Sequence, residues 1–239
     1  RSGELPVAGM GRIALDQSIA QALRAARRWQ VWRARGPAPE PPQELRLSRD
    51  VDDQPFVIED WSADLYRLAD GERLRLVLKA GDTLKAGHPH YPRLLSDWVQ
   101  HLALNAAGFN ARSVIIAHDA THSLPAMPCG SAAGPLDDIL RGWRAGLERP
   151  LPLPVRTVFA LLGQAPDKPI NAGTARPHYE GTTRHPGEMT FAGNGALRRC
   201  FPDADALFEP STDAGPLLVA WATRLYQPLI DALIREDGS

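Results

Sequence analysis

Two acidic residues and a lysine follow one another along neighbouring predicted strands with a spacing that suits metal-assisted chemistry. Asp60 and Asp64 lie in one strand pattern, and Lys79 ends the next. Carboxylates on adjacent strands can hold Mg²⁺, and a lysine beside them can orient water or stabilise developing charge. A further carboxylate is needed two places before the lysine, where this chain has Val77. The residue types therefore predict a site that keeps its lysine but lacks a full set of metal ligands.

Histidine pairs are a second possible source of metal chemistry. His118 and His122 stand four residues apart, as in zinc proteases, which need this spacing on a helix with Glu after the first His. Asp119 takes the place of that Glu, and a strand pattern precedes the pair. His88 and His90 flank a predicted turn, where histidines are usually solvated. We therefore assign no metal ligand and no catalytic residue to these pairs.

Composition excludes several classes of protein. The chain has 239 residues, a net charge of -1, 44% hydrophobic and 23% charged residues, which predicts a globular protein without an overall basic field. No apolar run approaches the about 20 residues of a membrane span, and no signal peptide is recognisable. The two cysteines imply no disulfide framework. We expect a cytoplasmic protein and, because the chain begins at Arg1, a segment of a longer polypeptide.

Nucleotide and acyl-transfer motifs are absent from the sequence. It contains neither the Gly-x-x-x-x-Gly-Lys-Ser/Thr loop nor a Gly-x-Ser-x-Gly elbow, so we expect no cofactor in this domain. Charge is unevenly distributed, because residues 1–36 hold seven Arg and only two acids. This basic segment is either a solvated helix surface or a contact for phosphate or an acidic partner.

The elements that must position Asp60, Asp64 and Lys79 begin with an amphipathic helix over residues 11–35. Strand alternation follows at 44–48, 56–66 and 73–79, and Asp70-Gly71 is a strong turn signal between the last two strands. A second helix over 92–107, ended by Gly108, precedes a short strand at 114–116 that is buried on both faces. The first helix is expected to bury one apolar stripe: Leu15, Ile19, Ala22, Ala26 and Trp29.

The C-terminal half is predicted to be mostly helical. Ser131 is expected to cap a third helix, a short helix covers 155–162, and a final helix over 214–234 is kinked at Pro228. Residues 164–215 lack periodicity and are predicted to be a long functional loop or a segment that a partner orders. The third helix is expected to bury five apolar residues: Leu136, Ile139, Leu140, Trp143 and Leu147. The whole chain is therefore an α/β fold with a mixed sheet and a helical C-terminal half.

The order helix, antiparallel strands, helix, strand resembles a metal-dependent nuclease core of the restriction-endonuclease-like, or PD-(D/E)XK, type. That core needs an Asp on its second strand and Asp/Glu-x-Lys on its third. Asp60 and Asp64 are the possible second-strand acids, and residues 77–79 read Val-Leu-Lys. The resemblance implies a catalytically degenerate nuclease fold. Two carboxylates converging on Lys79 would contradict this interpretation.

Short motifs along the chain carry a more specific resemblance. They occur at residues 5–11, 94–102, 106–108, 136–146, 150–152, 199–202 and 221–229. Together they resemble the C-terminal domain of RecC, the gamma subunit of exodeoxyribonuclease V, over residues 3–235. The resemblance implies one RecC C-terminal-type domain over 1–239, with a nuclease-like core at about 8–130 and a helical and irregular extension at about 131–239.

This family resemblance implies a non-catalytic scaffold and DNA-strand-guiding domain of the RecBCD helicase–nuclease. The complex acts in double-strand break repair by homologous recombination. The implied partners are RecD-type and RecB-type subunits and forked or single-stranded DNA, with no membrane. ATP and magnesium would be bound by the partner subunits, of which RecB carries the active nuclease.

Contact with single-stranded DNA requires aromatic platforms and scattered cations. The candidate residues for such contact also have a purely structural explanation. Those on the sheet are equally well explained by packing, and those in the irregular segment by exposure in a solvated loop. Two other functions stay open. One is an active metal-dependent nuclease or hydrolase that uses Asp60, Asp64 or the His118/His122 pair, and the other is a protein-interaction module that never touches DNA. The DNA-binding candidates are Trp61, Tyr66 and Arg67 on the sheet and Arg176, Tyr179, Arg184 and His185 in the irregular segment.

Overall fold

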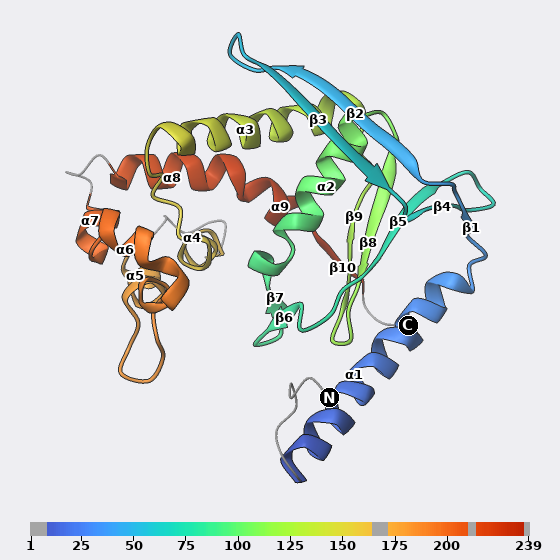
Figure 1. Ribbon diagram of the computed structural model, residues 1–239, viewed down its shortest axis with the longest axis horizontal. Coiled ribbons are helices and arrows are strands. Elements are labelled where there is room, and N and C mark those ends of the chain that lie inside the picture. Colours follow the sequence, from blue (N-terminus) through green and yellow to red (C-terminus); the bar gives the residue numbers. More distant parts are fainter. Residues whose placement is uncertain (1–8, 164–171, 210–213, 237–239) are drawn as a thin grey trace. The chain divides into compact units, whose positions relative to one another are not determined.

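A computed structural model of the chain describes residues 9–163, 172–209 and 214–236 (Figure 1). The described residues fall into two compact units. The first lies within residues 1–47, 58–129 and 233–239, and the second comprises 48–57 and 130–232. The fold is mixed α/β, as predicted, and within the described ranges no helix is long and apolar enough to cross a membrane.

A six-stranded mixed sheet is the centre of the first unit. Strands β5 and β8 are parallel, with Val77 opposite Ile115, and the other neighbouring strands are antiparallel. A parallel pair needs a crossover connection, which helix α2 provides between β5 and β8. The strands in spatial order are β1 (Ala38–Pro39), β4 (Leu65–Arg67), β5 (Arg73–Leu78), β8 (Ala111–Ile116), β9 (Thr121–Leu124) and β10 (Ile234–Glu236).

The predicted strand over 56–66 is in fact two strands in different sheets. Strand β3 (Pro55–Ser62) pairs with β2 (Gln43–Asp50) in a separate two-stranded sheet, whereas β4 joins the large sheet. The chain leaves one sheet and enters the other at Ala63 and Asp64. The turn at Asp70-Gly71 is confirmed, with Gly71 at φ +90°, a conformation that glycine adopts without strain. A further short hairpin consists of β6 (Leu84–Lys85) and β7 (His88–Pro89).

Two helices contact opposite faces of the large sheet. Leu74 and Leu76 of β5 form a core cluster with Trp32 of α1 (Gly9–Arg33). The alternate residues Arg75 and Lys79 contact α2 (Leu95–Ala106), which follows a 3-10 turn at Tyr91–Arg93. Successive strand residues point to opposite faces, so the alternation in β5 directs Leu74 and Leu76 to α1 and Arg75 to α2.

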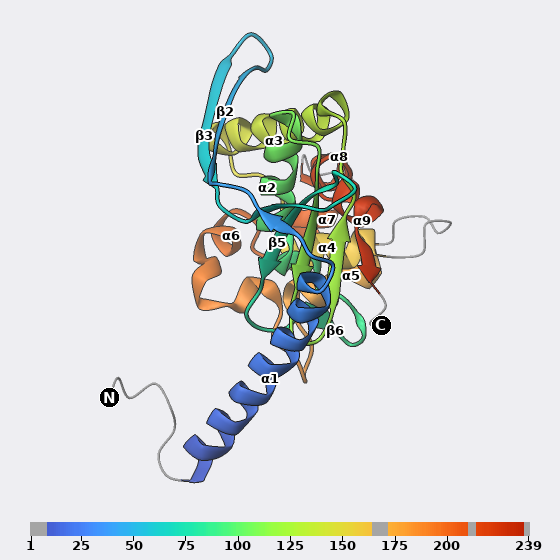
Figure 2. The ribbon, with the colours of Figure 1, turned by 90° about the vertical axis from the view of Figure 1, so that its right-hand side faces the viewer.

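The predicted buried stripe of the first helix was wrong except at Trp29, which is partly buried against the core cluster that contains Trp32. Leu15 and Ile19 are 45% and 49% exposed, and the buried residues of α1 are Gly11, Ala25 and Trp32. The C-terminal end of α1 lies against the sheet, while its N-terminal part extends away from it (Figure 2). By contrast, α2, its end at Gly108 and the burial of residues 114–116 in β8 agree with the sequence prediction.

Helices make up most of the second unit. Ser131 lies inside the third helix rather than capping it, and Trp143 and Leu147 are 59% and 69% exposed instead of buried. The predicted final helix is divided at Tyr226, just before Pro228, and β10 follows it. The helices are α3 (Cys129–Glu148), α4 (Val155–Leu162), α5 (Ala172–Glu180), α6 (Gly195–Cys200), α7 (Ala204–Phe208), α8 (Ala214–Leu225) and α9 (Gln227–Ala232).

The segment predicted to be irregular, 164–215, is largely structured where it is described. Residues 172–209 contain three short helices and two 3-10 turns (Glu188–Thr190 and Ala192–Asn194), and Tyr179, Leu207 and Leu218 share a core cluster. Helices of five to nine residues are too short to display a 3.6-residue period, and glycines and prolines separate them. Residues 164–171 and 210–213 lie outside the described ranges.

Candidate functional site

The α2-facing side of β5 carries Val77, and Lys79 follows the strand on the same side; the sequence singled out both positions. Arg75, two residues before Val77, shares this side. The Lys79 amide donates to Ile116 O at 2.8 Å, which fixes the lysine at the end of the strand pair. Its Nζ is hydrogen-bonded and ion-paired to Oδ2 of Asp97 on α2, whose side chain is 5% exposed. Lys79 is therefore neutralised by a single carboxylate from the helix above it.

Arg75 places a second cation in the same region. It is 6% exposed, and its Nη2 donates to Gln100 Oε1 of α2, while Nη1 has no hydrogen-bond partner in the described part of the chain. Burial lowers the pKa of the guanidinium, and the carboxylates of Asp97, Asp64 and Asp60 oppose that shift. A buried positive charge thus lies beside the acids that were candidate metal ligands.

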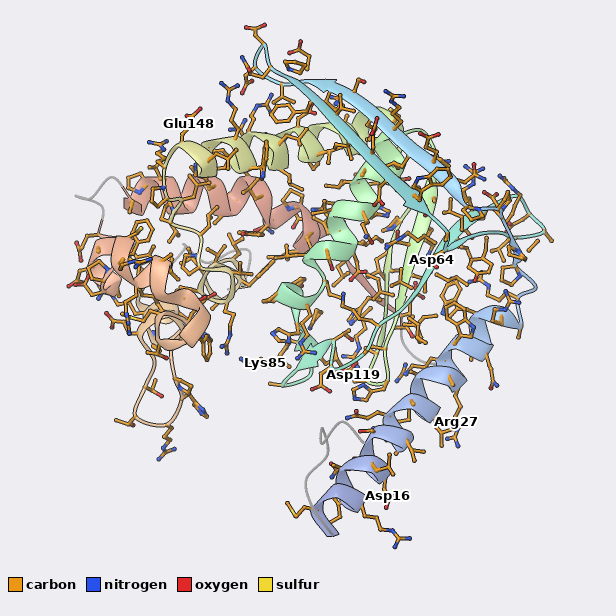
Figure 3. All side chains as sticks on the ribbon, viewed as in Figure 1. Asp16, Arg27, Asp64, Lys85, Asp119 and Glu148 are labelled. Carbon is orange, nitrogen blue, oxygen red and sulfur yellow. The ribbon has the colours of Figure 1, made fainter. Side chains whose placement is uncertain are left out.

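Asp60 and Asp64 line the same cavity, which has a volume of about 170 Å³. Asp60 Oδ1 accepts a hydrogen bond from its neighbour's amide, Trp61 N, at 2.8 Å. Asp64 lies between β3 and β4 (Figure 3), and Leu76 N donates to its carbonyl at 3.0 Å, which brings it alongside β5. Arg75 lines the cavity with the two acids. Val77, between Arg75 and Lys79 in the sequence of β5 and its end, supplies no carboxylate to this group.

The histidines belong to a separate network of hydrogen bonds. The Asp119 carboxylate accepts from Thr83 N at 2.8 Å, Thr83 Oγ1 at 2.9 Å and Leu84 N at 2.7 Å. Burial raises the pKa of Asp119, but these hydrogen bonds outweigh that effect and lower it. His122 Nε2 lies 3.0 Å from Thr83 Oγ1, and burial lowers the pKa of this histidine. Within the described residues, no three His, Cys, Asp or Glu side chains are placed to hold a metal ion.

The three DNA-binding candidates of the first unit differ in their surroundings. Trp61 is 67% exposed and lines the cavity beside Asp60 and Asp64. Tyr66 packs against the α1-side core, with its ring edge-on to Trp29 at 6.4 Å between centroids. Arg67 pairs with Glu40 at 2.7 Å. Of the three, Trp61 has the side chain most available to a ligand.

The four candidates of the second unit also separate into engaged and exposed side chains. Arg176 forms ion pairs with Asp205 and Glu209. Tyr179 is fully buried, and its hydroxyl donates to the Phe201 carbonyl, so in this structure its ring is part of the core. Arg184 and His185 are exposed in the loop between Gly181 and Pro186, where both amides donate to Thr182 Oγ1.

Sequence reasoning missed the residues that complete the β5 site. Arg75 is two strand positions from Val77 on the same face, and Asp97 and Gln100 are three apart on one face of α2. Each spacing is readable from the sequence. What the sequence does not supply is the pairing of this strand face with that helix face, because it depends on the crossover between β5 and β8.

Comparison with known proteins yields one family. A family model described as the RecC C-terminal domain matches residues 1–166, a range that contains the large sheet except β10, the β2–β3 hairpin and helices α1 to α4. The motifs at 199–202 and 221–229 lie beyond the matched residues. A search of curated proteins found no match.

Proposed function

The chain belongs to the RecC C-terminal domain family, and on that basis we propose that it is a non-catalytic scaffold and strand-guiding domain of an exodeoxyribonuclease V complex. Membership of the family ties the chain to the RecBCD complex and to DNA repair. In the proposed role it supports double-strand break repair by homologous recombination. ATP and magnesium are then held by the partner subunits rather than by this domain.

The proposal includes a degenerate restriction-endonuclease-like core in the first unit. Helix α1, the antiparallel strands β1, β4 and β5, the crossover helix α2 and the parallel strand β8 occur along the chain in the order of such a core, with the β2–β3 hairpin between β1 and β4. Asp64 precedes β4, and Lys79 follows β5. This agreement in order and strand direction supports the assignment.

The observation that carries the non-catalytic role is the set of side chains on β5. Mg²⁺ in a nuclease needs several oxygen ligands. Val77 contributes none, Lys79 is paired with Asp97, and Arg75 is buried where it attracts Asp60 and Asp64. Arg75 therefore offsets part of the negative charge that would otherwise attract a divalent ion, and Lys79 is already paired.

The alternative is an active metal-dependent nuclease, and the convergence of Asp60 and Asp64 on one cavity is the observation that favours it. The alternative predicts Mg²⁺- or Mn²⁺-dependent cleavage of labelled DNA that is lost in Asp64→Ala. The non-catalytic role predicts no cleavage with either ion.

Association with partner subunits tests the scaffold role. Tagged RecD-type and RecB-type subunits from the same source are mixed with the folded chain, and co-purification is measured by gel filtration. We expect the chain to elute with the RecD-type subunit. Failure to associate with either subunit, with all proteins shown to be folded, would remove the basis for a scaffold in this complex.

A further inference from the structure

An open pocket beside Trp61 combines an aromatic ring, two carboxylates and an apolar floor. Its volume is about 170 Å³. The polar side chains around it include Asp60, Asp64 and Gln100, and the floor includes Leu45, Ile58 and Leu104. All of these residues belong to the first unit. A few polar groups over apolar walls are typical of binding sites, and a volume below the roughly 300–1,000 Å³ of small-molecule pockets suits a single side chain.

The charges around the pocket do not balance. Arg75 is 6% exposed and provides one positive charge against the two carboxylates of Asp60 and Asp64. Asp97 adds nothing to this sum because it is paired with Lys79, and Glu59 is paired with Arg46 at 3.2 Å. One negative charge is therefore left for a ligand to neutralise.

Trp61 adds a second requirement on that ligand. Trp61 is 67% exposed and lines the pocket, so its ring is accessible to a ligand. A tryptophan face attracts cations, and a guanidinium group both stacks on it and donates hydrogen bonds to carboxylates. The aliphatic part of an arginine side chain would cover the apolar floor.

We propose that this pocket binds an arginine side chain of a partner protein. The guanidinium lies against Trp61 and donates to the carboxylates of Asp60 and Asp64. Arginine and tryptophan are common anchors of protein interfaces, where they fill central, desolvated pockets. The inference rests on the charge and shape of the pocket and adds a ligand that the proposed function does not name.

A DNA strand fits the same pocket less well. Trp61 is able to stack on a nucleobase, as any exposed aromatic ring is. However, the two carboxylates face a strand that carries one negative charge per nucleotide, and like charges brought together destabilise a complex. A nucleic-acid ligand is therefore an outcome that would contradict the proposal.

Indole NMR spectra of the full 239-residue chain test the proposal. The Trp61 indole N–H signal is assigned by its disappearance in Trp61→Phe, and that of Trp143, exposed in the second unit, is the internal reference. The probes are a blocked Gly-Arg-Gly tripeptide, its neutral citrulline analogue and a short single-stranded oligodeoxynucleotide. Asp60→Asn and Asp64→Asn are compared with Asp70→Asn, a matched change at an exposed turn.

We expect the arginine peptide to shift the Trp61 signal saturably and to bind roughly fivefold more tightly than the citrulline peptide, because only arginine forms charge-assisted hydrogen bonds. Asp60→Asn and Asp64→Asn should each weaken binding by a similar factor, and Asp70→Asn should not. The proposal would be overturned by equal binding of the two peptides, by the absence of a shift with either peptide, or by tighter binding of the oligodeoxynucleotide. It would also be overturned if Asp60→Asn and Asp64→Asn both bound the arginine peptide as tightly as the parent chain does. The scaffold role is tested by co-elution with partner subunits and the arginine pocket by the Trp61 NMR signal. Either proposal can therefore fail without the other.

Discussion

Arg75 and Lys79 stand on either side of Val77 along β5, and both make their polar contacts with side chains of α2. The sequence placed Val77 and Lys79 on one side of this strand, because a strand period of two is enough to align them. It could not identify Asp97 as the partner of Lys79. That pairing requires α2 to cross over this particular face, which no local pattern specifies.

Lys79→Met should destabilise the protein, because it leaves the buried Asp97 carboxylate without its counter-charge. Breaking a buried ion pair in this way costs about 3 kcal/mol. Urea unfolding at neutral pH measures the change in the free energy of unfolding, and Lys85→Met, which alters an exposed lysine, is the matched control. Equal stability of the two variants would show that the pair between Lys79 and Asp97 is not formed in solution.

His101 should make the stability depend on pH. Burial, and then the charge of Arg75, lowers its pKa from 6.5 to about 4. The unfolded state therefore binds a proton that the folded state does not in the window between these values. The histidine's contribution is present above about pH 6.5 and is lost as the pH falls towards 4, about 3 kcal/mol in total.

Unfolding free energies measured across this window check the prediction. The fall in stability on acidification should be smaller in His101→Asn than in the parent chain, and unchanged in His185→Asn, where the histidine is exposed. If His101→Asn loses as much stability on acidification as the parent chain does, another group titrates in its place.

At the scale of elements, sequence patterns succeeded where an element meets the core along its whole length. Helix α2 and strand β8 do so, and their type and burial follow from the sequence, although β8 begins at Ala111 rather than at residue 114. Helix α1 contacts the sheet only near its C-terminal end, so its apolar stripe did not predict burial. The short helices in 172–209 depend on contacts distant in sequence, which a local pattern does not contain.

One of these distant contacts is the carboxylate of Glu188, which caps α4. It accepts hydrogen bonds from Arg156 N at 3.1 Å, Thr157 N at 2.8 Å and Thr157 Oγ1 at 2.9 Å. Glu188→Ala should cost roughly 2 kcal/mol, because it leaves buried donors at the helix N-terminus without an acceptor. Hydrogen exchange of the amides in Val155–Leu162 and urea unfolding report the effect. Glu44→Ala, at an exposed glutamate, should change neither measurement, and equal behaviour of the two variants would contradict the capping role.

At the scale of the whole molecule, a net charge of -1 fits a domain whose contacts with DNA are local. The family assignment explains why a near-neutral net charge is suitable. A subunit of a multisubunit complex uses part of its surface to contact proteins, and that part does not need to be basic. The sequence predicted this identity from motifs spread over the chain. It did not predict which aromatic and cationic side chains remain free, because that depends on packing within each unit.

Forked DNA should bind through a small number of phosphate contacts, with Arg184 in the exposed loop as one of them. Each phosphate contact releases counterions, so the slope of log affinity against log salt should become less steep by about one unit in Arg184→Ala. Fluorescence anisotropy over a salt series measures both slopes, with Arg46→Ala, at an exposed arginine of the β2–β3 hairpin, as the control. A slope near zero for the parent chain would favour a module that contacts only protein.

The most direct test of the central claim is a metal-dependent cleavage assay. The full chain is incubated with end-labelled single-stranded and forked DNA over a titration of Mg²⁺ and, separately, Mn²⁺, beside Asp64→Ala and the exposed control Asp16→Ala. The non-catalytic role predicts no cleavage above background by any of the three proteins. Cleavage by the parent chain and by Asp16→Ala that disappears in Asp64→Ala would contradict it and establish an active nuclease site at the β5 face.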